Sequence, residues 1–264
     1  MCDGPVNDRP GGETGSMLRA AARAGWNGLT VGRARGFVQA NLFLVPATVA
    51  DEFAAFVRAN SQACPLLAIG RAGDPALPSL GAGIDVRTDL PAYLLHTPGE
   101  PPQHVAHLRQ DWRSDFVPFA IGCWFGAEAA IAAAGIRMRH AELGVQGGLF
   151  RTTRDTVPAG RFKGPVVVSM RPFAKPDVPR VIEITAALPR SHGAPLHRGD
   201  PAVLGITAPD HPDWGEPLPC CAGEEALFWA CGLTALMALE GAGVPFASHA
   251  PGAMLVTDLP ENVT

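Results

Sequence analysis

Charged residues are scarce in this 264-residue chain. Asp, Glu, Lys and Arg make up 17% of it, and the formal net charge is -4 at pH 7. The sequence therefore has no basic field that would hold a nucleic-acid backbone or an anionic lipid surface. Glycine-rich nucleotide motifs and the G-x-S-x-G elbow of serine hydrolases are also missing. We expect no nucleic acid, no membrane and no cofactor as a binding partner.

Cysteine pairs with C-x-x-C spacing are absent, although the chain has six cysteines. No cationic and apolar leader precedes them, so we expect reduced thiols and a cytoplasmic location. The adjacent Cys220 and Cys221 have no second thiol pair to complete a tetrahedral site. No metal is therefore predicted.

The chain is rich in apolar side chains and in the turn residues Gly and Pro. Hydrophobic residues make up 47% of it, and 30 Gly and 26 Pro divide it into short segments. This composition can bury the core of one large domain or two modest ones. Residues 1–16 have little to bury, so they are predicted to be a disordered tail, with structure beginning near Met17.

Short and continuously apolar runs predict strands that are buried on both faces. They lie at 41–45, 65–70, 165–170, 202–206, 226–231 and 253–258. Helical patterns separate them at 48–59, 177–188 and 233–240, with Asp177 and Thr234 as expected caps. Alternating strands and helices predict an α/β fold, with a mainly parallel mixed sheet covered by helices.

The stretch from Phe116 to Ile136 is apolar except for Glu128 and rich in alanine. Pro118 and the ionisable Glu128 argue against a membrane span, so a long buried helix is predicted. A polar, arginine-rich segment follows it. We interpret 112–163 as a smaller inserted α+β subdomain, and 17–111 together with 164–264 as the main α/β domain.

The segment 192–201 concentrates ionisable groups in a loop rich in Gly and Pro. His192, His197 and Asp200 lie within nine residues of one another, directly before a predicted strand. Such a loop suits a proton-transfer site. An equally weighted alternative is structural: the histidines bind loop carbonyls, and Asp200 starts a turn.

Three further segments carry candidate groups. Ser169 and Arg171 end a predicted strand, where Arg171 would clamp a carboxylate unless it is a surface residue paired with a nearby acid. Cys231 and Thr234 flank a helix start that suits an anion, and Cys231 is either a nucleophile or a small buried hydrophobe. His249 stands in a Pro/Gly turn as an acid or base that Asp258 could orient.

Glu128 and the remaining histidines complete the set of ionisable candidates. A carboxyl in an apolar helix has a raised pKa unless it is paired, which suits a general acid; the alternative is exposure on the solvent side of that helix. The histidines at 96, 104, 107, 140 and 211 lie in polar surroundings and are predicted to be surface residues.

Eight segments, in this order, resemble the D-glutamate cyclase family, whose bacterial members are called hydro-lyases. They are GFVQANLFLVP (36–46), CPLLAIGRAGDPALPSLG (64–81), IDVRTDLPAY (84–93), IGC-x-F (121–125), GPVVVSMRP (164–172), HGAPLHRGDP (192–201), FWACG-x-T (228–234) and HAPGAMLVTDL (249–259). The resemblance implies an α/β plus α+β fold and conversion of D-glutamate to 5-oxo-D-proline with loss of water. The resemblance supplies no catalytic residues. The candidates are therefore chosen for their chemistry and for their positions in the matching motifs.

The resulting hypothesis is a hydro-lyase whose partner is a small amino-acid or carboxylate substrate; a homodimer is an open option for its assembly. Its catalytic candidates are His192, His197, Asp200, Cys231 and His249. Its substrate-binding candidates are Arg171, Ser169, Thr234 and Glu128. The alternatives are a non-catalytic binder of small carboxylates and a thiol-dependent hydrolase. All these readings require the distant loops to meet around one pocket.

Overall fold

The computed structural model describes residues 12–261. Residues 1–11 of the predicted tail lie outside the described residues. The first helix, α1 (Gly15–Arg23), begins two residues before the expected start at Met17. It begins there because the Thr14 hydroxyl accepts a hydrogen bond from the Met17 amide, 3.3 Å from nitrogen to oxygen.

The larger of two sheets is built around β1 (Phe37–Pro46). Its strand order is β2-β5-β1-β10-β3-β4, and β11 pairs with the first half of β1 beside β10. The other strands are β2 (Leu66–Ile69), β3 (Tyr93–His96), β4 (Gln103–Val105), β5 (Phe116–Gly122), β10 (Phe246–His249) and β11 (Leu255–Pro260).

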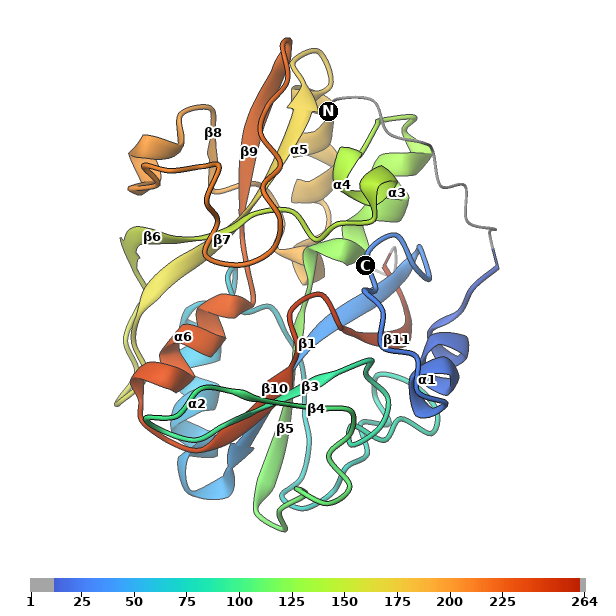
Figure 1. Ribbon diagram of the computed structural model, residues 1–264, viewed down its shortest axis with the longest axis vertical. Helices are drawn as coiled ribbons and strands as arrows, with labels where there is room; N and C mark the ends of the chain where they lie inside the picture. The colour runs from blue at the N-terminus through green and yellow to red at the C-terminus, as the bar shows by residue number, and fades with distance from the viewer. Residues whose placement is uncertain (1–11, 262–264) are drawn as a thin grey trace.

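The smaller sheet has the order β6-β7-β9-β8 and lies above the larger one in Figure 1. Its strands are β6 (Leu149–Asp155), β7 (Pro165–Ala174), β8 (His197–Arg198) and β9 (Glu224–Ala230). The described residues therefore form two sheets rather than one, and the chain crosses between them twice, after β5 and again after β9.

The predicted mainly parallel sheet is wrong, because every strand pairing in both sheets is antiparallel. The continuously apolar runs do have the expected cause. Along β1, Phe43 and Val45 enter one core cluster, whereas Leu42 and Leu44 enter another. Burial on both faces makes a strand apolar throughout, and it does so for either strand direction.

Helices cover the faces of the sheets. The helices α2 (Ala47–Ala59) and α6 (Leu233–Gly241) bury side chains in the same cluster as Phe43 and Val45. The helices α3 (Glu128–Ala133) and α5 (Val178–Ala186) share another cluster with residues of β7 and β9. The short α4 (Arg139–Leu143) lies beside α3 (Figure 1). The helices predicted at 48–59, 177–188 and 233–240 are thus confirmed.

Two predicted elements are wrong. The long helix at 116–136 is instead β5 followed by the 3-10 turn η1 (Trp124–Ala127) and α3. Residues 116–122 pair with β1 on one side and β2 on the other, and this pairing overrides the helical tendency of the alanines. The strand expected at 202–206 is mostly the 3-10 turn η3 (Pro201–Leu204), where the Asp200 carboxylate accepts the Ala202 amide.

The segment 112–163 supplies β5 to the larger sheet and β6 to the smaller one. Its assignment as an inserted subdomain stays a prediction. Within residues 12–261, no helix combines the length and the apolar character needed to cross a bilayer.

Candidate active site

A cavity lies where the two sheets meet, and its walls come from both. Asn41 of β1 and His249 of β10 belong to the larger sheet, whereas Ser169 and Arg171 belong to β7 of the smaller sheet. A cavity at such a junction of elements is a normal place for a small molecule.

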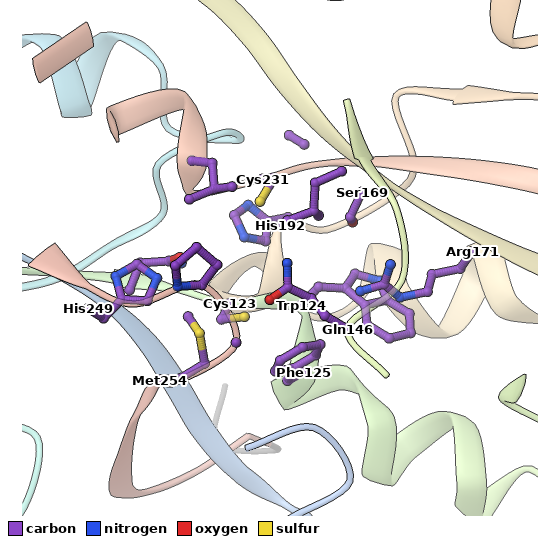
Figure 2. Close-up of a pocket in the computed structure, with 16 residues that line it drawn as sticks. Cys123, Trp124, Phe125, Gln146, Ser169, Arg171, His192, Cys231, His249 and Met254 are labelled. Carbon is purple, nitrogen blue, oxygen red and sulfur yellow. The ribbon is translucent and has the colours of Figure 1, made fainter. Parts of the chain in front are cut away.

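Five of the predicted site residues line this one cavity: Ser169, Arg171, His192, Cys231 and His249. They come from segments up to 80 positions apart in the sequence, counted from 169 to 249. Figure 2 shows Arg171, Trp124 and Gln146 gathered toward one end and His249 with Met254 at the other. The two cysteines at 123 and 231 lie between these ends in that view.

Arg171 is buried, with a relative exposure of 2%, so it is not the exposed surface arginine of the alternative reading. Its Nη1 donates to the Met170 carbonyl at 2.9 Å, and its Cζ lies 5.1 Å from the centre of the Trp124 ring. Within residues 12–261 it has no carboxylate at ion-pair distance. Burial lowers the pKa of Arg171, but a guanidinium stays a cation at any physiological pH.

Four buried donors around the cavity have no hydrogen-bond partner within the described part of the chain. They are Arg171 Nε, Ser169 Oγ, Trp124 Nε1 and Gln146 Nε2. A buried donor without a partner costs about 1–3 kcal/mol, so several in one place call for an acceptor that binds there. Together with the cation of Arg171, which Glu128 attracts only from beyond ion-pair distance, they form a site for an anion.

Both cavity histidines are neutral. Burial lowers the pKa of His192 and of His249 to about 4 each, and for both rings nearby backbone carbonyls offset only part of the effect. Nδ1 of His249 lies 3.3 Å from the Leu42 carbonyl oxygen, and Nδ1 of His192 lies 2.9 Å from that of Gln62. Because a carbonyl can only accept, the Nδ1 atom of each ring carries the hydrogen, which leaves Nε2 as the basic atom of His249.

Two thiols line the cavity as well. Cys123 follows β5 directly and Cys231 follows β9 directly, so each thiol comes from a different sheet. Burial raises the pKa of Cys123 to about 12 and that of Cys231 to about 11, although Arg171 and one backbone amide each lower them. Both thiols are therefore protonated at neutral pH, which argues against Cys231 as a ready nucleophile.

Glu128 does not line the cavity. It is fully buried and accepts hydrogen bonds from the Gly32 amide at 2.7 Å and from His140 Nε2 at 3.0 Å. The His140 ring packs edge-on against the Trp124 ring, with 5.2 Å between their centres. The Glu128–His140 pair therefore supports the same indole ring that Arg171 contacts. The expectation that His140 is a surface residue is wrong, and it is wrong for the buried His96 too.

Four other candidates, His197, Asp200, Thr234 and Asp258, lie away from the cavity lining. Nε2 of the half-buried His197 contacts the Asp200 carbonyl oxygen at 2.7 Å, and the Asp200 side chain caps the start of η3. Thr234 lies inside α6, where its hydroxyl accepts the Val167 amide at 3.0 Å, so it is no helix cap. Asp258 binds Arg19 at 2.9 Å instead of orienting a histidine.

Sequence reasoning missed Cys123, Trp124, Gln146 and Asn41, which all line the cavity. The first two were hidden by the expectation of a helix from 116 to 136. Gln146 stands in a segment without regular structure, and nothing in its sequence context singles it out. Asn41 was the detectable one, since an amide inside an otherwise apolar strand run needs buried partners; it donates to the Ile121 and Gly122 carbonyls.

Within residues 12–261 no group of three or more His, Cys, Asp or Glu side chains is placed to hold a metal ion. The free thiols in that range are Cys64, Cys123, Cys220 and Cys231. Cys221 is disulfide-bonded, so the expectation of reduced thiols is wrong for this residue.

Comparison with known proteins identifies relatives across nearly the whole chain. The family model described as D-glutamate cyclase matches residues 117–258. A protein of Verminephrobacter eiseniae named "Putative hydro-lyase" is 46% identical, covering 91% of this chain and 89% of its own. A Pseudomonas aeruginosa protein with a name of the same form is 47% identical over 92% of both chains.

A solved structure of a nitrogen repressor-like protein from Methanococcus jannaschii covers 92% of this chain and 97% of its own. Its TM-score is 0.38 and its sequence identity 9%, which is too low to carry an argument. The family model and the relatives at 46–47% identity agree with each other. The chain therefore belongs to the D-glutamate cyclase family.

Proposed function

We propose that this protein is a hydro-lyase that cyclises D-glutamate to 5-oxo-D-proline and releases water. The observation that carries the proposal is the anion site at one end of the cavity: the buried Arg171, without a carboxylate partner in the described chain, beside unpartnered donors of Ser169 and Trp124. A guanidinium flanked by such donors suits an α-carboxylate. The family membership and the hydro-lyase names of the relatives support the choice of reaction.

The α-carboxylate binds at Arg171, and the rest of the substrate extends toward the histidines. Ring closure needs the amine to lose protons and attack the side-chain carboxyl carbon, forming the new C–N bond. One carboxyl oxygen then leaves. The two hydrogens that leave nitrogen depart with that oxygen as water, so no proton is consumed overall.

His249 is the group that carries these protons. Its ring is neutral at physiological pH and Nε2 is its basic atom, so it can take a proton from the amine and return it to the departing oxygen. His192 is neutral too, and its ring contacts the carbonyls of Gln62 and Gly122. These two carbonyl contacts hold the His192 ring in place, which suits a role in positioning the substrate.

Turnover assays on matched histidine variants test the proposal. Purified protein given D-glutamate should form 5-oxoproline, detected by the loss of water in mass spectrometry. His249→Gln should lower kcat by about 100-fold or more, the usual contribution of a general base. His197→Gln is the control, because His197 is a half-buried residue outside the cavity lining.

Three results would contradict the proposal. An unimpaired His249→Gln variant would remove the assigned base. Thermal stabilisation by D-glutamate without any turnover would show a carboxylate-binding protein instead of an enzyme. Turnover that survives Arg171→Gln with an unchanged KM would remove the anion site from the reaction.

A further inference from the structure

The two thiols at 123 and 231 have no task in ring closure as described above. They come from different sheets, since Cys123 directly follows β5 of the larger sheet and Cys231 directly follows β9 of the smaller sheet. Both lie between the Arg171 end and the His249 end in Figure 2. A carboxylate on Arg171 therefore brings its α-carbon into the section of the cavity that the thiols line.

We infer that Cys123 and Cys231 are a proton-transfer pair that exchanges the hydrogen on the α-carbon of the bound carboxylate and so interconverts its D and L forms. The inference rests on the proposed function for the identity of the ligand, an α-amino acid such as glutamate or its lactam. One sulfur works on each face of the α-carbon, which is the arrangement that inversion of a stereocentre requires.

The chemistry balances without a cofactor or an oxidant. One cysteine, as thiolate, takes the α-hydrogen, and the electron pair of the C–H bond moves onto the carboxylate as an enolate. The other cysteine, as thiol, gives its proton to the opposite face of the same carbon. The ligand leaves with the opposite configuration, and thiol and thiolate have exchanged places.

The anion end of the cavity stabilises the intermediate of this exchange. Negative charge builds up on the carboxylate oxygens, which face the cation of Arg171 and the donors Ser169 Oγ and Trp124 Nε1. Preorganised donors aimed at developing charge are the largest catalytic term in many enzymes. Burial raises the pKa of each cysteine and Arg171 lowers it in part, so the thiolate that starts the exchange forms more readily as the pH rises. The same groups that bind the substrate thus acidify its α-carbon.

Incubation of the full-length protein in D2O tests the inference. D-glutamate and 5-oxo-D-proline are supplied separately, and chiral chromatography with mass spectrometry follows the opposite enantiomer. We expect that enantiomer to appear with one deuterium at the α-carbon. Cys123→Ser and Cys231→Ser should each lower its formation by about 100-fold or more. Cys220→Ser is the matched control, because Cys220 is a free thiol outside the lining of this cavity.

The outcomes separate the two proposals. Water loss from D-glutamate without α-deuteration overturns the thiol pair and leaves the cyclase intact. Deuterated enantiomer without water loss supports the thiol pair and overturns the cyclase. Inversion that is unchanged in both single variants overturns the assignment of Cys123 and Cys231. Loss of inversion together with loss of stabilisation by 5-oxoproline in both variants also overturns it, because the thiols then serve binding only.

Discussion

The guanidinium carbon of Arg171 lies 5.1 Å from the centre of the Trp124 ring, and this aromatic face stands where a buried arginine normally has a carboxylate. The arrangement keeps the cation in place without neutralising it. A carboxylate partner would occupy the donors that an anionic ligand needs. The ring thus explains how the site can stay both buried and unpaired.

Substitution of Trp124 separates the contribution of its ring face from that of its indole N–H. Trp124→Phe keeps an aromatic face but removes the donor Nε1, so we expect affinity for 5-oxoproline to fall by about 3- to 10-fold, the value of one hydrogen bond. Trp124→Leu also removes the cation–π contact, worth about 1 kcal/mol more, and should bind about 5-fold more weakly than Trp124→Phe. Titration calorimetry measures both. Wild-type affinity in Trp124→Leu would refute the role of the ring.

The pair of Glu128 and His140 is expected to stabilise the fold behind this ring. Glu128→Ala leaves the Gly32 amide and a His140 nitrogen without their acceptor in a fully buried position. We expect the free energy of unfolding to fall by about 3 kcal/mol. Urea denaturation measures it. The control is Glu142→Ala, because Glu142 pairs with the half-exposed Arg137 and such pairs contribute less than about 1 kcal/mol. Equal losses in both variants would contradict the prediction.

The three fully buried histidines, His140, His192 and His249, make the protein sensitive to acid. Each has its pKa lowered by burial from 6.5 to about 4. Above pH 6.5 neither state is protonated, and their contribution to stability is fully present. As the pH falls from 6.5 toward 4, these histidines bind protons in the unfolded state but not in the folded state, so the free energy of unfolding falls.

Between pH 7 and pH 5 this loss amounts to about 2 kcal/mol for each histidine. Urea denaturation at the two pH values measures it. His249→Gln should lose about 2 kcal/mol less than the wild type over this interval, whereas His107→Gln, at an exposed site, should behave like the wild type. An unchanged pH dependence in His249→Gln would show that its ring is protonated in the folded protein.

Local patterns predicted the elements well and their pairing badly. Apolar runs located β1, β2, β7, β9 and β11, because burial on both faces leaves a direct mark on sequence. Strand direction leaves no such mark. The run from Phe116 was misassigned because Ala, Ile and Gly fit a buried helix as well as a buried strand, and contacts with the distant β1 and β2 decide the outcome.

Prediction of the cavity residues likewise succeeded for individual groups and failed for their arrangement in space. Arg171, Ser169, Cys231, His192 and His249 stood out because ionisable or polar groups at strand ends and in Gly/Pro turns are unusual. His197 and Asp200 belonged to the same sequence cluster as His192, yet they lie elsewhere. The positive φ of His192, +71°, and that of Gly193, +66°, turn the chain there, so closeness in sequence did not give closeness in space.

Gly232 is expected to hold the cavity open at the junction of the sheets. A β-carbon built there would lie 2.3 Å from Nδ2 of Asn41, whose amide lines the cavity and bonds the Ile121 and Gly122 carbonyls. Gly232→Ala must therefore displace Asn41 and break these bonds. We expect a loss of about 2 kcal/mol in stability and of at least about 10-fold in affinity for 5-oxoproline.

Gly241→Ala is the control at the other end of α6, because its β-carbon would approach only the Lys163 carbonyl oxygen at 3.7 Å, an ordinary contact. If Gly232→Ala binds 5-oxoproline as tightly as Gly241→Ala does, the cavity does not depend on the position of Asn41, and the two sheets fix its shape without that side chain.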